Sequence, residues 1–288
     1  MTMRKSFTIE SERGGFLDLL NDKYFYLTEF DGETHGESEI SSTTALGFDG
    51  DIINDERVLP RVVNLELTIK DGVSVEEAKR HICQVIKLKH ACTFKMTKGE
   101  KNIELTGKAR IIDMPRYKQG VVLNATFHCS DPFWADARET IRNLTGTTPL
   151  HFFTYDDEGA ELFFPEEGVP FSVYNFEREQ TFVNEGDSAV GLTIRIVAMG
   201  EVINPIIYAS TGEYIGVNTT MQENDVVTIT THKGNKTAQK NGVNILDKLM
   251  DGSTWLQLET GRNTFNIDDD TEDSLNMYFE IEYKQRYI

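Results

Sequence analysis

Cysteine, basic charge and long apolar runs are all scarce in this chain of 288 residues. Its three cysteines, Cys83, Cys92 and Cys129, are an odd and sparse set, so a disulfide scaffold is not needed and reduced thiols are expected. No apolar run is long enough to span a bilayer, and residues 1–5 lead into an alternating strand rather than into the apolar part of a signal peptide. The sequence therefore predicts a soluble protein that folds in a cytosol, has no secretory signal and does not use a membrane.

The shortage of basic charge is concentrated in the second half of the chain. The whole sequence carries 29 Lys and Arg against 47 Asp and Glu, a formal net charge of -18. Residues 1–134 hold 18 basic and 21 acidic side chains, and residues 135–288 hold the other 11 and 26. Because an acidic surface repels phosphate backbones, sequence-specific nucleic-acid binding is not expected. The simplest interpretation of the acidic half is a well-solvated, exposed surface.

Motifs of the common enzyme classes do not occur in the sequence. It has no P-loop, no dinucleotide-binding fingerprint and no paired catalytic carboxylates. Gly186-Asp187-Ser188 is similar to the nucleophile block of some esterases, but the chain has no Gly-x-Ser-x-Gly elbow and no Asp-x-x-His that would supply a base. A turn between strands is the favoured interpretation of this tripeptide. We therefore expect neither an enzyme nor a cofactor.

Two groups of residues suggest a metal, and neither has suitable spacing. His81 and Cys83 lie two residues apart on a predicted helix and point to different sides, and His90 and Cys92 have the same spacing. The acidic run 268–273 lacks the Gly and the bidentate Glu that an EF-hand loop requires. A solvated acidic loop is therefore expected at 268–273, and no metal site is predicted.

The first half of the chain is predicted to consist of strands and a single helix. Ser74 and Glu77 have the spacing of a capping box, and an apolar stripe follows them to Ile86. The segment 31–56 is polar, Gly-rich and acidic, and is predicted to be a long loop that is functional or becomes ordered on assembly. The residues between 113 and 121 are expected to connect a hairpin. The expected strands are 6–10, 23–29, 62–69, 92–97, 101–105, 107–113 and 121–129.

The second half contains almost only short alternating runs, which predicts a two-sheet sandwich. For residues 138–141 a helical turn and a strand remain open. Trp255 fits packing in the core, and a sugar-stacking platform is the alternative. The expected strands are 150–154, 160–164, 170–174, 179–183, 190–198, 203–209, 213–217, 225–230, 235–239, 253–258, 262–267 and 275–284.

The hexapeptide Cys129-Ser130-Asp131-Pro132-Phe133-Trp134 separates the two halves. The alternating strand before it ends at Pro132, which has no N–H to donate and biases Asp131 toward an extended or turn conformation. Phe133 and Trp134 then supply two large aromatic side chains that fill the space beside the strand. The predicted domains are therefore residues 1–133 and 134–288, with Asp131, Pro132, Phe133 and Trp134 as the junction.

This hexapeptide and several landmarks around it resemble one protein family. A strand ending in (C/S)-x-D-P-(F/Y)-W near the middle of the chain is similar to the siphophage tail component family, the distal tail (Dit) proteins of long-tailed phages. Further landmarks of the family occur in order at 61–69, 184–188, 204–205, 211–213 and 252–263, so the resemblance covers roughly residues 60 to 267.

The resemblance implies a structural tail protein. It implies a mainly β fold, in which a β-sandwich-like first domain with one α-helix and a long hairpin is followed by a galectin-like sandwich. It further implies a virion protein, the hub of the distal tail or baseplate, that forms a homohexameric ring. The implied partners are the tail tube or major tail protein, the tape-measure protein and a tail-associated or receptor-binding protein.

An extended hairpin can reach a neighbouring subunit, so Arg116, Tyr117 and Lys118 at the predicted hairpin tip are candidate ring-interface residues, together with the loop 31–56. The alternative function is a carbohydrate-binding adhesion protein that uses the second domain.

Overall fold

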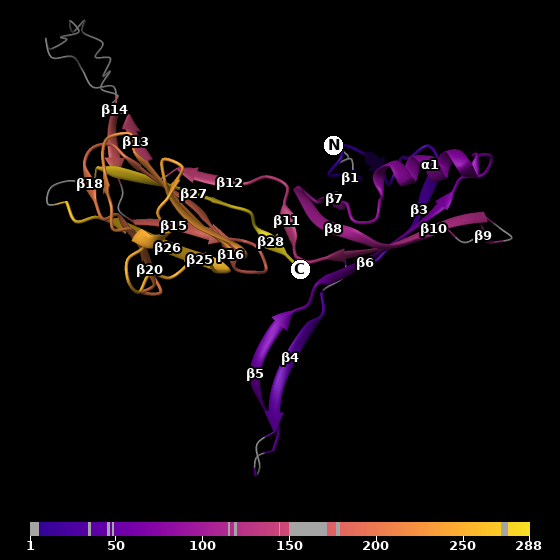
Figure 1. The fold of residues 1–288 in the computed structure, drawn as a ribbon, viewed down its shortest axis with the longest axis horizontal. Coiled ribbons are helices and arrows are strands. Elements are labelled where there is room, and N and C mark those ends of the chain that lie inside the picture. The colour runs from indigo at the N-terminus through magenta and orange to yellow at the C-terminus, as the bar shows by residue number, and fades with distance from the viewer. Residues whose placement is uncertain are drawn as a thin grey trace, which may run out of the picture. The chain divides into compact units, whose positions relative to one another are not determined.

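A computed structural model describes residues 6–33, 36–44, 47, 49–114, 116–117, 120–143, 145–149, 172–176, 179–271 and 276–288. The chain forms two compact units, residues 1–138 with 284–288, and residues 139–283 (Figure 1). These units differ from the expected domains 1–133 and 134–288 by residues 134–138 and the last five residues. The expected ranges describe functional domains and stay a prediction. Within the described residues, no helix combines the length and the apolar character needed to cross a bilayer.

The first unit is built on one ten-stranded antiparallel sheet, with its central strands in the order β2-β1-β7-β8-β10-β6-β3. β11 pairs with β8 and with β28, and β9 pairs with β10. The strands are β1 Phe7–Ser11, β2 Phe16–Asp18, β3 Phe25–Phe30, β6 Arg61–Ile69, β7 Ala91–Lys98, β8 Lys101–Asp113, β9 Arg116–Tyr117, β10 Gly120–Cys129, β11 Trp134–Asp136 and β28 Arg286–Tyr287. The predicted strands 101–105 and 107–113 are a single strand, β8, which continues through Gly107.

The core of the first unit lies on one face of this sheet. Alternate residues of β6 and β10 are buried, as their period-two pattern predicts. The ring of Phe7 in β1 lies 4.6 Å from the ring of Phe30 in β3, although these strands are far apart in the strand order. The sheet therefore curls, so that its two ends share one apolar core.

Helix α1, Val75–Val85, contributes to the same core and confirms the helix predicted from the sequence. The Ser74 side chain accepts a hydrogen bond from the Glu77 backbone N–H at 3.5 Å, which caps the first turn. Ile82 and Val85 are buried on the inner side of the helix. The predicted capping box and apolar stripe therefore give the correct element and the correct buried face.

The prediction of a long loop over residues 31–56 is wrong. This segment contains most of a two-stranded hairpin, β4 Ser38–Thr44 and β5 Asp51–Val58. In Figure 1 the hairpin runs away from the rest of the first unit, and it forms a sheet of its own. We call β4 and β5 the arm. Its residues are exposed on both faces, so the alternation of buried and polar residues that marks a core strand is missing from the sequence.

The second unit is the predicted two-sheet sandwich. Its larger sheet has the strand order β12-β27-β17-β22-β23-β24, and its smaller sheet has the order β15-β26-β19-β20. Three strand pairs, β13–β14, β16–β25 and β18–β21, accompany them. The strands are β12 Thr140–Asn143, β13 Thr145–Pro149, β14 Ser172–Phe176, β15 Glu179–Asn184, β16 Val190–Gly191, β17 Thr193–Ala198, β18 Val202–Ile203, β19 Ile206–Ala209, β20 Tyr214–Gly216, β21 Thr220–Met221, β22 Val226–His232, β23 Asn235–Lys240, β24 Val243–Asn244, β25 Gln257–Leu258, β26 Gly261–Asp268 and β27 Met277–Tyr283.

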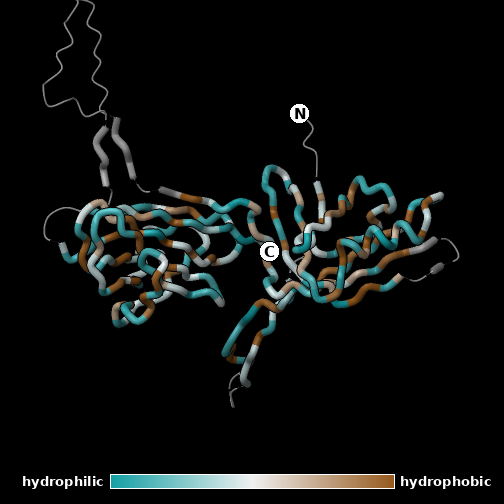
Figure 2. The backbone as a smooth tube through the Cα atoms, turned by 45° about the horizontal axis from the view of Figure 1, so that its top comes forward, coloured by the Kyte–Doolittle hydropathy of each residue, from teal (hydrophilic) through white to brown (hydrophobic). Residues whose placement is uncertain are grey.

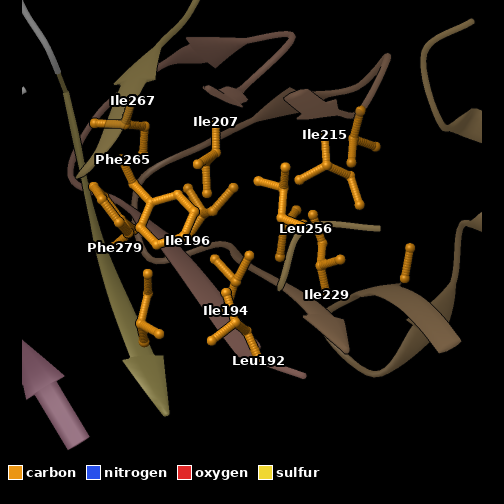
Figure 3. Close-up of a cluster of buried hydrophobic side chains, with 14 of the residues drawn as sticks. Leu192, Ile194, Ile196, Ile207, Ile215, Ile229, Leu256, Phe265, Ile267 and Phe279 are labelled. Carbon is orange, nitrogen blue, oxygen red and sulfur yellow. The ribbon is translucent and has the colours of Figure 1, made fainter. Parts of the chain in front are cut away.

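The inner faces of the two sheets pack against each other. Ile194 and Ile196 of β17 face Ile207 of β19 and Phe265 of β26, and all four are fully or almost fully buried (Figure 3). Alternate residues of β17, β22 and β27 are buried, as the short alternating runs predict. A short 3-10 helix, Leu246–Lys248, follows β24. Residues 138–141, which were left open, include the start of strand β12. The predicted strands 150–154 and 160–164 lie outside the described residues.

Because each unit has its own core, core substitutions should destabilise the units separately. Phe94→Ala removes a fully buried ring from the first unit, and Phe265→Ala removes one from the second. Each is expected to lower the unfolding free energy of its own unit by about 3–5 kcal/mol. Hydrogen exchange during denaturant titration of the full chain measures the protection of backbone amides in each unit separately. A loss of protection in both units with either variant would show that the cores do not unfold independently.

Candidate functional site at the root of the arm

The arm is exposed and carries apolar side chains. Ile40 is 54% exposed and Ile53 is 62% exposed, and Figure 2 shows hydrophobic stretches along the arm. Arg57 pairs with Glu39 at 2.5 Å, but both side chains are more than half exposed, so this pair contributes little stability. A lone two-stranded hairpin is marginally stable in water. The arm therefore has the properties of a surface that is covered in an assembly.

A bulge sorts the side chains of the arm between its two faces. The strand register shifts so that one extra residue, Asn54, lies in β5. Cross-strand partners share a face, and successive pairs alternate between faces. With the bulge, Ile40, Ile53 and Val58 lie on the same face of the hairpin, and Ile52 lies on the other face. Without the bulge, Ile53 would face away from Val58, so Asn54 is required for a continuous apolar stripe.

A buried arginine holds the root of the arm. Arg61, the first residue of β6, is 5% exposed. Its Nε donates to the backbone carbonyl of Pro132 at 2.7 Å, and its Nη1 donates to the carbonyl of Gly32 at 2.8 Å. Burial lowers the pKa of the Arg61 guanidinium from its usual value, although the group stays charged. Arg61 therefore joins the segment that enters the arm to the junction hexapeptide.

Trp134 and Gly32 complete this connection. The Trp134 indole N–H donates to the same Gly32 carbonyl at 3.1 Å, and the indole packs edge-on against Phe30. A Cβ atom at position 32 would lie 2.4 Å from the tip of the Phe30 ring, which is itself packed in the core. The position therefore requires glycine for steric reasons. The carbonyl that both donors share is thus fixed two residues after β3 ends, where the chain has left the sheet toward the arm.

The remaining junction residues bind neighbouring segments of the first unit. The Asp131 carboxylate accepts a hydrogen bond from the Phe133 N–H at 3.4 Å, and it pairs with Arg286 of β28. The Arg286 guanidinium also lies 5.6 Å from the centre of the Phe133 ring. The predicted junction residues thus act together, because Pro132 and Trp134 hold the arm, and Asp131 and Phe133 hold the final strand.

Three further hydrogen bonds fix the direction in which the arm leaves the sheet. The Asp31 carboxylate accepts from the Asn64 backbone N–H at 2.5 Å and from its side-chain amide at 2.7 Å. Farther out, the Leu59 N–H donates to the Glu37 carbonyl at 2.7 Å. The two chain segments at the root are therefore bonded to the sheet and to each other.

The predicted interface at the tip of the other hairpin is described only in part. Arg116 and Tyr117 form β9, which pairs with Val121 and Gly120 of β10. Lys118 lies outside the described residues. A role for these three residues at a ring interface stays a prediction.

The histidine and cysteine pairs considered for zinc do not converge. His81 Nε2 lies 3.0 Å from the Asp22 carboxylate, and His90 Nδ1 lies 2.8 Å from Glu12. Cys83 is exposed and Cys92 is buried. The hydrogen bond from His90 holds the pKa of the Glu12 carboxyl below its usual value. Among the described residues, no group of three or more His, Cys, Asp or Glu side chains is arranged to hold a metal ion.

The other residues singled out in the second unit have structural contacts. Ser188 donates from its hydroxyl to the Ala189 carbonyl at 3.3 Å, and Asn184 donates from its side chain to the Ser188 carbonyl at 3.0 Å. Trp255 packs against the core of the sandwich. In the acidic run, Asp270 accepts from the Asn204 side chain at 2.8 Å. Residues 272–273 of that run lie outside the described residues.

Sequence reasoning missed Arg61, Gly32 and the apolar residues of the arm. Arg61 begins a strongly alternating strand, and a charged residue at the end of a strand is expected to be exposed to solvent. The signal for the arm is the doublet Ile52-Ile53, which breaks strict alternation at the position where the bulge occurs. Arg61 lies three positions before the run Asn64-Leu65-Glu66-Leu67, and nothing in the local sequence indicates that its partners are backbone carbonyls far along the chain.

Replacing Arg61 should weaken the root specifically. Arg61→Ala removes the donors to Gly32 and Pro132 and is expected to lower the unfolding free energy of the first unit by about 3 kcal/mol. Arg57→Ala, which removes an exposed arginine of the arm, is the matched control and is expected to cost less than about 0.5 kcal/mol. Denaturant titration measures both, and amide exchange at Leu59 reports whether the root has opened. Equal effects from the two variants would contradict the role given to Arg61.

The comparisons with known proteins agree with this architecture. Residues 185–287, most of the second unit, match the family model described as Siphovirus-type tail component, C-terminal domain. A search of curated proteins found no match.

Among solved structures, the Dit protein (gp 19.1) of SPP1 is similar to this chain with a TM-score of 0.68 and 15% sequence identity, and the alignment covers 98% of this chain and 99% of that one. That protein is described as a paradigm of the hub adsorption apparatus in phages that infect Gram-positive bacteria. A chain of the phage P2 baseplate in its activated conformation is 12% identical, with a TM-score of 0.48 and 98% coverage of both chains.

The fold of the whole chain is thus that of a distal tail protein, as the junction hexapeptide and the ordered landmarks predicted. The family model adds a sequence match over the second unit that is independent of the fold. Residues 185–287 therefore match the siphovirus-type tail component family, and the chain as a whole has the fold of the SPP1 distal tail protein (Dit).

Proposed function

We propose that this protein is the hub of a siphovirus-type tail tip, a structural part that joins the tail tube to the components that contact the host. The observation that carries the proposal is the agreement of two independent matches, the family model over residues 185–287 and the shared fold over nearly the whole chain. The architecture supports it, because one unit carries a rooted, exposed arm suited to assembly and the other carries a strongly acidic sandwich.

The first unit would form the ring. Subunits in a ring associate head to tail, so each must present two different surfaces that fit each other. The arm is one such surface, because its exposed apolar stripe is held on a rigid root. The hairpin of β8 and β10, with Arg116 and Tyr117 near its tip, is a second projecting element. We propose six copies in the ring, with the tail tube and the tape-measure protein as axial partners.

The second unit would dock outer components. Residues 139–283 carry 8 basic and 25 acidic side chains, against 21 basic and 22 acidic in the first unit. Such a charge difference favours partners with basic surfaces and makes association sensitive to salt. A tail-associated or receptor-binding protein is the class of partner that we propose for this surface.

Native mass spectrometry of the purified full chain tests the ring, together with negative-stain imaging of the same sample. The expected species has about 196 kDa, six times the 32.7-kDa chain, and an annular outline, because head-to-tail contacts close on themselves. The control is the same sample diluted until the assembly dissociates to the monomer. A stable trimer, or a monomer with clear affinity on a glycan array, would favour the carbohydrate-binding alternative.

Deleting residues 114–120 tests the role of the second hairpin. β8 and β10 remain paired through Asn124 and Asp113 and beyond, so the shortened chain is expected to fold with unchanged circular dichroism. It should stay monomeric under conditions in which the full chain assembles, because the projecting tip is lost. A matched deletion of the exposed turn at 233–234 in the second unit serves as the control. Normal assembly of the 114–120 deletion would contradict this role.

A further inference from the structure

We propose that the smaller sheet of the second unit binds a neutral, extended oligosaccharide on its outer face, across a row formed by Tyr214, Tyr208, Asn266 and Glu179. We call these four residues the tyrosine row. The inference goes beyond the hub proposed above, because it assigns to the second unit a ligand-binding site that ring assembly does not need.

The four residues lie directly opposite one another on four neighbouring strands. Tyr214 of β20 pairs with Tyr208 of β19, and Tyr208 pairs in turn with Asn266 of β26. Asn266 pairs with Glu179 of β15. Because direct cross-strand partners share a face, all four side chains lie on the same face of the sheet. Neighbouring strands are roughly 4.8 Å apart, so the three spacings give a row roughly 14 Å long, which is comparable with several linked sugar rings.

The tyrosine row is on the outer face of the sheet. Its sequence neighbours Ile207, Ile215 and Phe265 belong to the core of the sandwich and are at most 1% exposed (Figure 3). Because successive residues of a strand alternate between faces, the row points away from that core. Tyr208 is 40% exposed, and Asn266 is exposed as well. The row is therefore accessible to a ligand.

The two tyrosine rings form one aromatic surface with a fixed geometry. Their centroids lie 5.9 Å apart, with 45° between the ring planes. The Tyr214 hydroxyl donates to the backbone carbonyl of Asp251 at 2.6 Å. Gly252 has a φ of +82°, and a Cβ atom there would lie 2.7 Å from the same hydroxyl, so glycine lets this loop pack against the ring. A ring that is held before the ligand arrives loses little conformational entropy on binding.

The side chains of the row have the chemistry that binds a saccharide. A sugar ring presents an apolar face of C–H groups, which packs against an aromatic ring, and it presents hydroxyls at its edge. The Asn266 amide both donates and accepts hydrogen bonds, and the Glu179 carboxylate accepts them from hydroxyls. Aromatic rings at one end of the row and planar hydrogen-bonding groups at the other suit successive sugars of an extended chain.

The charge on this face selects a neutral ligand. Glu179 lies in the row, and Asp268 lies on the same face in the next row. Arg262 shares the face but lies two rows from Asn266 on the other side. The second unit as a whole carries 8 basic and 25 acidic side chains. A polymer rich in phosphate or carboxylate groups would therefore be repelled, and a neutral oligosaccharide would not.

Trp255, the residue for which a sugar-stacking platform was the alternative, does not belong to this row. It packs against the core of the sandwich, and the Lys236 Nζ atom lies 5.5 Å from the centre of its ring. The indole is therefore already in contact with a cation and with the core. The tyrosine row, rather than Trp255, is the site that we propose.

Saturation-transfer difference NMR with the full chain tests the site, because the method detects weakly bound small ligands on a large protein. The probes are the neutral trisaccharides cellotriose, maltotriose and tri-N-acetylchitotriose, and dextran sulfate is the anionic control. At least one neutral probe is expected to receive saturation at its ring C–H protons, and isothermal titration calorimetry then measures its Kd. The absence of transfer to all three at millimolar concentration, or transfer to dextran sulfate alone, would overturn the proposal.

Substitutions in the row then locate the bound sugar. Tyr208→Ala and Asn266→Ala are each expected to weaken binding about tenfold, because they remove the aromatic surface or the amide, and Tyr208→Phe should stay within about twofold of the original. Tyr26→Ala, which removes a 61% exposed tyrosine from the first unit, is the matched control and should leave the Kd unchanged. Circular dichroism checks that each variant is folded. Undiminished binding by folded Tyr208→Ala protein would show that the row is not the site.

The same measurements separate this site from the hub. A sixfold assembly that transfers no saturation to the neutral probes keeps the hub and removes the site. A signal that depends on Tyr208, from a chain that stays monomeric, keeps the site and favours the carbohydrate-binding alternative over the hub.

Discussion

The guanidinium of Arg61 is the interaction on which the assembly surface depends. It lies buried at the start of β6 and donates to carbonyls of two segments that are distant in sequence, Gly32 before the arm and Pro132 in the junction. A buried cation is stable only when its donors are satisfied, so the two carbonyls and the guanidinium hold each other in place. The arm projects in one direction because both of its ends enter this network. An arm on a loose root would lose conformational entropy on binding, and a fixed root avoids most of that loss.

This network also explains the composition of the junction hexapeptide. Pro132 offers its carbonyl to Arg61, Trp134 donates its indole N–H to Gly32, and Asp131 with Phe133 holds Arg286. Each of these residues contacts a specific partner. The composition of the hexapeptide therefore follows from these contacts rather than from the general preference of turns for proline and of cores for aromatic residues. The hexapeptide therefore does more than link two domains. It binds three separate segments of the first unit.

Much of the fold could be predicted from the sequence, and the failures have physical causes. Strict alternation in 62–69 and 121–129 and the capping box at Ser74 reflect burial on one face, which local sequence records directly. The arm was missed because neither of its faces is buried in a single chain, so its residues carry no such pattern. Arg61 was missed because its partners are backbone carbonyls, which leave no trace in side-chain sequence. The resemblance to the tail component family could be seen in the sequence because the junction residues make specific contacts, which fixes their types and their order along the chain.

The last five residues matter for how this protein can be divided. β28 pairs with β11 in the first unit, Lys284 reaches Glu104 at 3.1 Å, and Lys101 lies 4.4 Å from the centre of the Tyr287 ring. The first unit is therefore discontinuous in sequence, and no single cut of the gene yields both units whole. A fragment beginning at residue 139 carries β28 without its partner strand, and a fragment ending at residue 138 leaves β11 with an open edge that can pair with other chains. Joining residues 284–288 to residue 138 through a short linker would restore that edge, so the natural way to produce the first unit alone is to replace residues 139–283 by a linker.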